Sequence, residues 1–256
     1  MYNKNEKPNY TVFAGINGAG KSTLYEDVDK ELLGVRINAD EIAKEIGDFN
    51  DPKVQLKAGR IAVKKMRTCI KDKVNFNQET VLSGKSTIVQ MQKLKNEGYK
   101  IRLMYIGLEN KELAVKRVAE RVKNGGHNIP KALIYERYNK SLENLKLAMK
   151  LADEIRIYDN SKEQQERETL FAVKDNKIIY EAEEIPMWFE DIHEHGIKEI
   201  AAIDKDSKLN QNMSEPKDEI LKSEKSKDDE FMKEYLEKQR RKSLAKEHKK
   251  DLEIER

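Results

Sequence analysis

Cysteine is almost absent from this 256-residue chain, because Cys69 is its only one. A single thiol excludes an internal disulfide and a cysteine-rich zinc site, and it is typical of a protein kept in a reducing cytoplasm. Long apolar runs are missing too. No stretch approaches the ~18 apolar residues that span a bilayer, and the opening MYNKNEKPNY contains no apolar signal-like core. We therefore expect a cytoplasmic protein without a membrane segment.

The chain also lacks an excess of charge of one sign. Its 50 basic and 47 acidic side chains leave a net charge of +3, so no global field favours nucleic acid as a partner. Charges of both signs crowd the C-terminal end, which is too polar to form a core. We expect one α/β domain over residues 1–203, followed by a charged tail over 204–256 that is either helical or disordered.

Strand and helix patterns alternate along the first 160 residues. Strands are predicted at 10–15, 35–37, 74–84, 99–108 and 154–160, and helices at 21–33, 41–46, 52–72, 86–98, 110–126 and 131–152. This alternation predicts a mostly parallel sheet with helices on both faces, whose ligands bind at the carboxyl ends of the strands. Residues 169–182 then predict a hairpin that turns at Asp175 and Asn176. Residues 185–200 predict a short helix on which Trp188 is a packing residue.

A phosphate-binding motif lies between the first predicted strand and the helix after it. Residues 15–22, GINGAGKS, fit the pattern G-x-x-x-x-G-K-[ST]. In such a loop the backbone N–H groups converge on phosphate oxygens, Lys21 reaches the outer phosphates, and the Ser22 hydroxyl enters the shell of Mg²⁺. The predicted nucleotide-binding residues are Gly15, Asn17, Gly18, Ala19, Gly20, Lys21, Ser22 and Thr23.

Two acidic residues lie near the carboxyl ends of predicted strands, at the same edge of the sheet. Asp40 can accept the proton of an acceptor hydroxyl during attack on a γ-phosphoryl group, or it can simply cap the helix that follows. Glu79 can bind substrate hydroxyls or a metal-bound water, or it can be an ordinary solvated residue. Both are candidates for the site, with these alternatives open.

Three arginines flank a glycine-containing loop, KNGGHNIP. Arg117 and Arg121 lie four residues apart on one predicted helix, and Arg137 follows the loop. Arginines on such a mobile lid can bind the nucleotide and cover a migrating phosphoryl group, although surface arginines also pair with neighbours such as Glu120. His127 in the loop has no cluster of further ligands and is not expected to bind a metal.

Two motifs that resemble other nucleotide-binding proteins are incomplete. The second GKST, at residues 84–87, lacks the first glycine of a phosphate loop, and neither NKEL nor NKSL has the aspartate of a guanine-binding Asn-Lys-x-Asp. A regulatory GTPase or motor is therefore a poor fit, whereas a small kinase with a lid fits well.

Five segments together resemble the zeta toxin family, the P-loop kinases of bacterial toxin–antitoxin systems. They are GINGAGKST, RINADEIA, ETVLSGKS, RVAERVKNGGHNIP and ERYNKSLENL, and they cover about residues 8–160. The resemblance implies ATP-dependent phosphorylation of a hydroxyl of UDP-N-acetylglucosamine, with an antitoxin protein as a partner. It also implies that Lys21 and Ser22 hold ATP and Mg²⁺, and that Asp40 is the base.

The same resemblance assigns the remaining site residues. Glu79 and Thr80 contact the nucleotide sugar, and Arg121 and Arg137 stabilise the transferring phosphate. The chain departs from the family pattern where Ala39 replaces a frequent proline and where Val81 replaces a threonine, and the second change leaves the sugar specificity open. Two alternatives remain: a kinase for another acceptor, such as a nucleoside or dinucleotide, or a nucleotide-regulated interaction module that works through its charged tail.

Overall fold

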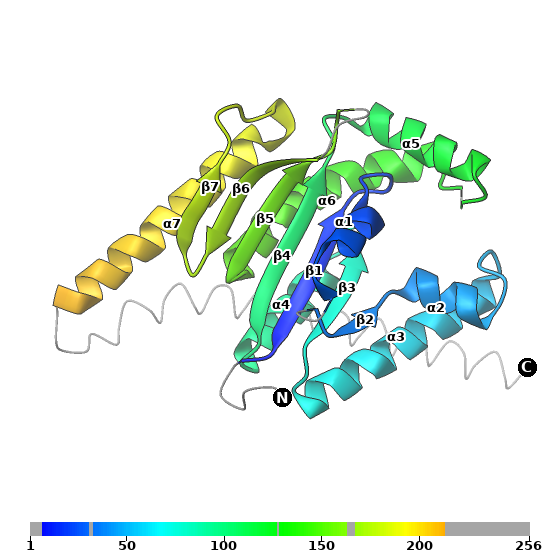
Figure 1. Ribbon diagram of the computed structural model, residues 1–256, viewed down its shortest axis with the longest axis horizontal. Helices are drawn as coiled ribbons and strands as arrows, with labels where there is room; N and C mark the ends of the chain where they lie inside the picture. Colours follow the sequence, from blue (N-terminus) through cyan, green and yellow to red (C-terminus); the bar gives the residue numbers. More distant parts are fainter. Residues whose placement is uncertain (1–6, 31–32, 127, 163–166, 213–256) are drawn as a thin grey trace, which may run out of the picture. The chain divides into compact units, whose positions relative to one another are not determined.

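The computed structural model of the chain describes residues 7–30, 33–126, 128–162 and 167–212 (Figure 1). The chain divides into two compact units, Met1–Lys205 and Asp206–Arg256, and the fold described below is that of the first. Of the expected charged tail, only residues 204–212 are described, as the end of a helix. The lid residue His127 lies outside the described residues.

Within the described ranges, seven strands form one sheet in the order β2-β3-β1-β4-β5-β6-β7 (Figure 1). Their bounds are β1 Asn9–Gly15, β2 Val35–Ile37, β3 Phe76–Thr80, β4 Lys100–Gly107, β5 Glu154–Asp159, β6 Glu168–Lys174 and β7 Lys177–Glu181. Strands β1 to β5 pair in parallel, and β6 and β7 add an antiparallel hairpin. The hairpin turns at Asp175 and Asn176, whose φ angles of 49° and 59° are those of a tight hairpin turn. The predicted fold class is confirmed.

The described residues form seven helices that connect or follow these strands. Their bounds are α1 Lys21–Asp27, α2 Ala39–Ile46, α3 Pro52–Asp72, α4 Ser86–Asn96, α5 Lys111–Lys123, α6 Lys131–Leu151 and α7 Met187–Asn212. Pro52 stands at the first position of α3, where its missing N–H costs no helical hydrogen bond. None of the described helices has the length and apolar character needed to cross a membrane.

Two helices differ most from the prediction in length. Helix α1 ends at Asp27 rather than continuing to residue 33, because Val28 takes an extended conformation with φ −90° and ψ 142° while its side chain still packs against the core. The helix that was expected to be short, α7, runs for 26 residues. Gly196 does not stop it: a Cβ there would lie 2.7 Å from Met149 Cε, so this glycine permits a close helix contact.

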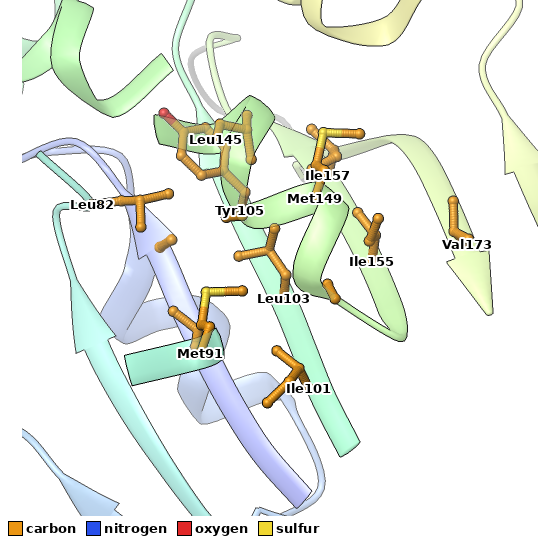
Figure 2. Packing of buried hydrophobic residues seen from close by; sticks show 14 of the residues in the cluster. Leu82, Met91, Ile101, Leu103, Tyr105, Leu145, Met149, Ile155, Ile157 and Val173 are labelled. Atoms are coloured by element: carbon orange, nitrogen blue, oxygen red, sulfur yellow. The ribbon is translucent and has the colours of Figure 1, made fainter. Parts of the chain in front are cut away.

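Among the described residues the core has three clusters. Two of them lie on opposite faces of the sheet, because alternate strand residues point to opposite faces, and the third packs Ile42 and Ala43 of α2 against Ala58 of α3. Tyr10, Val12 and Ala14 of β1 join one cluster with residues of α4, α6 and α7, whereas Phe13 joins the other with residues of α1, α5 and α6. Figure 2 shows the first cluster around Met91, Leu103 and Leu145. Helix α6 contributes residues to both of the clusters that cover the sheet.

Trp188 is a packing residue, as predicted. Its side chain is buried at the start of α7, and its indole N–H donates to Asp159 Oδ1 at 3.1 Å. The ring lies directly on Gly107, where a Cβ would come within 2.1 Å of it. This contact fixes α7 against the carboxyl ends of β4 and β5.

Buried tyrosines make the fold sensitive to alkaline pH. Burial raises the pKa of Tyr99 to about 12 and that of Tyr138 to about 12, and both phenols donate to backbone carbonyls. Burial also raises the pKa of Tyr10 and Tyr105. An unfolded tyrosine ionises near ~10, so the unfolded chain loses these protons first and stability falls as the pH rises from ~10 towards ~12. Absorbance of tyrosinate at increasing pH, read beside urea unfolding midpoints, checks this; normal titration of all ten tyrosines in a folded protein would contradict it.

Candidate active site

The phosphate loop connects β1 to α1 in the predicted strand–loop–helix context. Gly18 has φ 82°, and a Cβ there would lie 3.0 Å from the carbonyl oxygen of Ala114 and 3.3 Å from Arg117 Cβ. Gly20, the residue before α1, has φ 97°, and a Cβ there would lie 2.8 Å from Asn160 Nδ2. Both positions need glycine for their conformation. A side chain at Gly18 would also press on the backbone of α5, and one at Gly20 would displace the Asn160 amide from the loop.

Lys21 is the buried charge at the centre of the site. Its ammonium donates to the carbonyl oxygen of Ile16 at 3.0 Å, which folds the side chain back over the loop. Burial lowers the pKa of Lys21, because the charged form loses its hydration. Four charged residues also act on this pKa, two acids raising it and two arginines lowering it: Glu79, Asp40, Arg121 and Arg137. The fold has therefore brought together residues from four elements that are far apart in the sequence.

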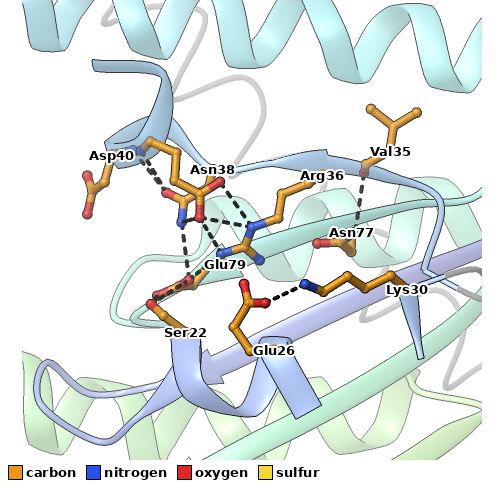
Figure 3. A network of polar contacts seen from close by, with 10 residues as sticks. Ser22, Glu26, Lys30, Val35, Arg36, Asn38, Asp40, Asn77 and Glu79 are labelled. Carbon is orange, nitrogen blue, oxygen red and sulfur yellow. Dashed lines mark hydrogen bonds and ion pairs between the residues drawn. The ribbon is translucent and has the colours of Figure 1, made fainter. Parts of the chain in front are cut away.

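A network of polar contacts joins the start of α1 to β2 and β3 (Figure 3). Ser22 Oγ donates to the Glu79 carboxylate at 3.3–3.4 Å. Arg36 Nη2 donates to Glu79 Oε2 at 2.9 Å and to Glu41 Oε1 at 2.7 Å. The guanidinium also lies 3.5 Å from the centre of the Tyr25 ring. Glu79 is thus held in place and is not the freely solvated residue that one alternative proposed.

The cap of α2 is Asn38, not Asp40. The Asn38 side chain accepts from the backbone N–H of Asp40 at 3.0 Å and of Glu41 at 3.5 Å, and its amide donates to Glu79 Oε2 at 3.1 Å. The capping alternative for Asp40 was therefore wrong. Asp40 is exposed in the first turn of α2, and Figure 3 shows its carboxylate pointing away from the Asn38–Glu79 contacts. Within the described part of the chain, that carboxylate has no hydrogen bond or ion pair.

The three predicted arginines lie on α5 and α6 and face the loop from the other side. Arg137 Nη1 donates to Asn17 Oδ1 at 3.1 Å. The Cβ of Arg117 would lie 3.3 Å from a Cβ on Gly18, which places the stem of Arg117 near the loop, and Arg121 acts electrostatically on Lys21. A Cβ on Gly126 would lie 2.5 Å from Arg121 Cγ, so this glycine lets the end of the lid pack against the arginine stem.

Thr80, the second residue assigned to the acceptor, lies at the end of β3 beside Glu79. Its hydroxyl accepts from the backbone N–H of Leu82 at 3.0 Å and lies 3.5 Å from the hydroxyl of Thr87. Among the described residues, no group of three or more histidine, cysteine or acidic side chains could hold a metal ion. Any metal here would therefore depend on nucleotide phosphates and water as further ligands.

Several residues of the site were not singled out from the sequence. Arg36 and Asn38 lie within the RINADEIA segment, but their contacts to Glu79 depend on the pairing of β2 with β3. Asn160 follows β5, and its amide donates to the carbonyl oxygen of Ala19 at 2.9 Å. Its position directly after a strand was a usable signal, because ligands gather at that edge of the sheet.

A phosphate loop on a parallel sheet, faced by carboxylates on one side and by arginines of two helices on the other, is the arrangement of a P-loop phosphotransferase. Comparison of the sequence with protein-family models agrees with this class of enzyme and identifies a family within it. Residues 1–170 match the model of the zeta toxin family, and the chain belongs to that family.

Individual relatives are distant or uncharacterized. A protein of Haemophilus influenzae described as uncharacterized is 36% identical over 126 residues, which are 49% of this chain and 89% of that protein. AvrRxo1-ORF1:-ORF2 with ATP superposes with a TM-score of 0.57 at 13% identity, covering 75% of this chain and 64% of that one. The PezAT chromosomal toxin–antitoxin system of Streptococcus pneumoniae gives a TM-score of 0.50 at 17% identity, covering 78% and 88%. These two structures share the fold, and this chain spans less than two thirds of the AvrRxo1 chain.

The Arg36 contacts predict a stability difference between two variants. Arg36→Ala leaves the Glu79 carboxylate, whose side chain is only 14% exposed, without its cation, and should lower the free energy of unfolding by about 2 kcal/mol. Glu41→Gln removes the other, 47% exposed partner and should cost less than about 1 kcal/mol. Urea unfolding of both variants measures the difference. Equal losses would contradict the assigned importance of the Arg36–Glu79 pair.

Proposed function

We propose that this protein transfers the γ-phosphoryl group of ATP to a hydroxyl of UDP-N-acetylglucosamine or a related nucleotide sugar. The observation that carries the proposal is the state of Asp40: its carboxylate is exposed and unpaired among the described residues, yet it acts electrostatically on Lys21. A base beside the phosphate loop, free to take a proton, is what a hydroxyl acceptor requires. Family membership and the fold shared with an ATP-containing structure support the choice of reaction and nucleotide.

The phosphate loop is assigned to the nucleotide. Residues 15–23 bind the phosphates through backbone N–H groups, and the Lys21 ammonium leaves the Ile16 carbonyl to contact the outer phosphates. Arg117 is assigned to the nucleotide because its stem lies near Gly18, so close that a Cβ there would come within 3.3 Å of Arg117 Cβ. Because the loop closes on the start of α1, the phosphates also meet the positive end of that helix.

The Ser22–Glu79 pair fits Mg²⁺. A hydroxyl and a carboxylate are the oxygen donors that this ion prefers, and they lie 3.3–3.4 Å apart at the loop. Mg²⁺ bound there would neutralise charge on the phosphates during transfer. Arg36 and Asn38 both donate to Glu79 Oε2, so Oε1 keeps the greater accepting capacity for a metal-bound water or a substrate hydroxyl.

Proton and phosphoryl transfer are assigned to opposite sides of the site. The acceptor hydroxyl gives its proton to the Asp40 carboxylate as its oxygen forms the new bond to γ-phosphorus. The bond from that phosphorus to the bridging oxygen breaks, and the charge goes to the leaving ADP. Arg121 and Arg137, whose charges reach Lys21, stabilise the equatorial oxygens of the migrating group. Glu79 and Thr80 are assigned to hold the acceptor.

The biological role that follows is that of a toxin. We assign the kinase activity to residues 1–203 and place the protein in the cytoplasm, where a phosphorylated nucleotide sugar would be lost to cell-wall synthesis. An antitoxin partner is part of the proposal. It is supported by the family and by the shared fold with the chain of a toxin–antitoxin system.

Replacing the proposed base tests this assignment. Asp40→Asn should lower kcat for transfer from ATP to UDP-N-acetylglucosamine by at least about 10²-fold, because the acceptor hydroxyl then lacks a base. Binding of ATP should be nearly unchanged, since the phosphate loop is intact. Glu45→Gln, on the same helix and also exposed, is the matched control and should keep full activity. Retained turnover in Asp40→Asn would refute the base, and parallel loss in Glu45→Gln would point to damage of α2 instead.

A further inference from the structure

The segment that follows β3 has an unusual backbone conformation. We call residues 80–84 the acceptor loop, since they begin at Thr80 beside Glu79. Leu82 in this loop has φ 60°, which lies in the left-handed region that residues other than glycine and asparagine rarely adopt. The Leu82 side chain is fully buried in the first core cluster, which also contains Tyr105 and Leu145 (Figure 2). A conformation that costs free energy persists only when its surroundings hold it.

Two polar side chains of α6 hold this loop through its carbonyl groups. Ser141 Oγ donates to the carbonyl oxygen of Val81 at 2.7 Å, and Asn144 Nδ2 donates to that of Leu82 at 2.8 Å. Ser141 is 0% and Asn144 3% exposed. A buried polar group without a hydrogen bond lowers the stability of the fold, because it has lost its bonds to water. Each of these two bonds therefore satisfies both the side chain and the carbonyl group that it contacts.

The hydrogen bonds form a directed chain that leads to the loop. Ser141 has one hydroxyl proton, which it gives to Val81, so the 3.0 Å contact between Tyr105 OH and Ser141 Oγ requires Tyr105 to be the donor. Burial raises the pKa of Tyr105, which keeps this proton in place. Since Leu82 N–H also donates to the Thr80 hydroxyl at 3.0 Å, both backbone polar groups of Leu82 are fixed.

The same helix reaches the phosphate loop. Arg137, which donates to Asn17, stands one turn before Ser141, and Asn144 stands one turn after it. Residues at spacings of four and three share one side of a helix. Helix α6 therefore contacts the nucleotide side of the site at one end of this row and the acceptor side at the other.

From these contacts we infer that Ser141 and Asn144 are positioning residues for the acceptor. They hold Val81 and Leu82 in the conformation that presents Glu79 and Thr80, and they do so from the helix that carries Arg137. The inference rests on the proposed function, in which Glu79 and Thr80 bind the acceptor. It also gives Val81 a role through its backbone carbonyl. A valine can fill that role as well as the threonine of the family pattern, because the side chain takes no part in the hydrogen bond.

Kinetics of Ser141→Ala and Asn144→Ala test the inference. Each variant should raise KM for UDP-N-acetylglucosamine about ten-fold, the equivalent of one buried hydrogen bond, while the Kd of ATP changes by less than about two-fold. The fall in kcat should be smaller than the rise in KM, because Asp40 lies on a different element.

The matched control is Tyr138→Phe. Tyr138 also lies on α6 and its buried hydroxyl also donates to backbone carbonyls, but those belong to Leu108 and Glu109 in another loop. This variant should leave the acceptor KM unchanged. If all three variants raise the acceptor KM and the Kd of ATP together, Ser141 and Asn144 only stabilise the fold and the inference is overturned.

Hydrogen–deuterium exchange gives a second readout that needs no acceptor. Amides of residues 80–84 should exchange faster in Ser141→Ala and Asn144→Ala but not in Tyr138→Phe. If wild-type protein transfers nothing to UDP-N-acetylglucosamine, the proposed acceptor fails and exchange alone decides the matter. Faster exchange confined to residues 80–84 then supports the inference, and exchange equal to wild type overturns it.

Discussion

The phosphate loop, residues 15–22, is the constraint on which the rest of the site depends. Separate elements contact four residues of it: α6 bonds to Asn17, α5 packs near Gly18, the segment after β5 bonds to Ala19, and β3 bonds to Ser22. A loop this tightly contacted fixes the distances between elements that share no sequence neighbourhood. The parallel sheet sets the edge at which these elements meet, and the loop sets their spacing.

Charge is divided across that loop. Carboxylates come from the β2–β3 side, where Asp40 and Glu79 lie, and arginines come from α5 and α6, with Lys21 buried between them. In phosphoryl transfer, negative charge moves from the attacking oxygen towards the leaving group, so the proposed base on one side and the arginines on the other would match the direction of charge flow. The two sides of the site meet at the phosphate loop. Helix α6 connects them a second time, because it packs in both of the core clusters that cover the sheet.

Much of the fold could be predicted because its signals are local. The strand at residues 35–37 and the helix at 52–72 match the structure in both bounds, since periodicity and the proline after Asp51 mark them directly. The ends of α1 and α7 could not be predicted. Val28 fits the helical spacing but has an extended backbone, and Gly196 would normally mark the end of a helix but lies inside α7, where it allows a close contact with Met149. Asp40 was the only residue considered as the cap of α2, whereas the helix begins two residues earlier than that interpretation requires and is capped by Asn38. The Arg36 contacts depend on β2 lying beside β3, which no local pattern records.

The central claim is that this zeta toxin family member uses its divided charge to phosphorylate a nucleotide sugar. The most direct measurement is mass spectrometry of products after incubation of the protein with ATP, Mg²⁺ and a panel of UDP-sugars, nucleosides and dinucleotides. The account predicts a gain of one phosphate on UDP-N-acetylglucosamine or a close relative, and none on the other classes. Transfer to a nucleoside or dinucleotide alone, or no transfer from ATP that is demonstrably bound, would contradict it.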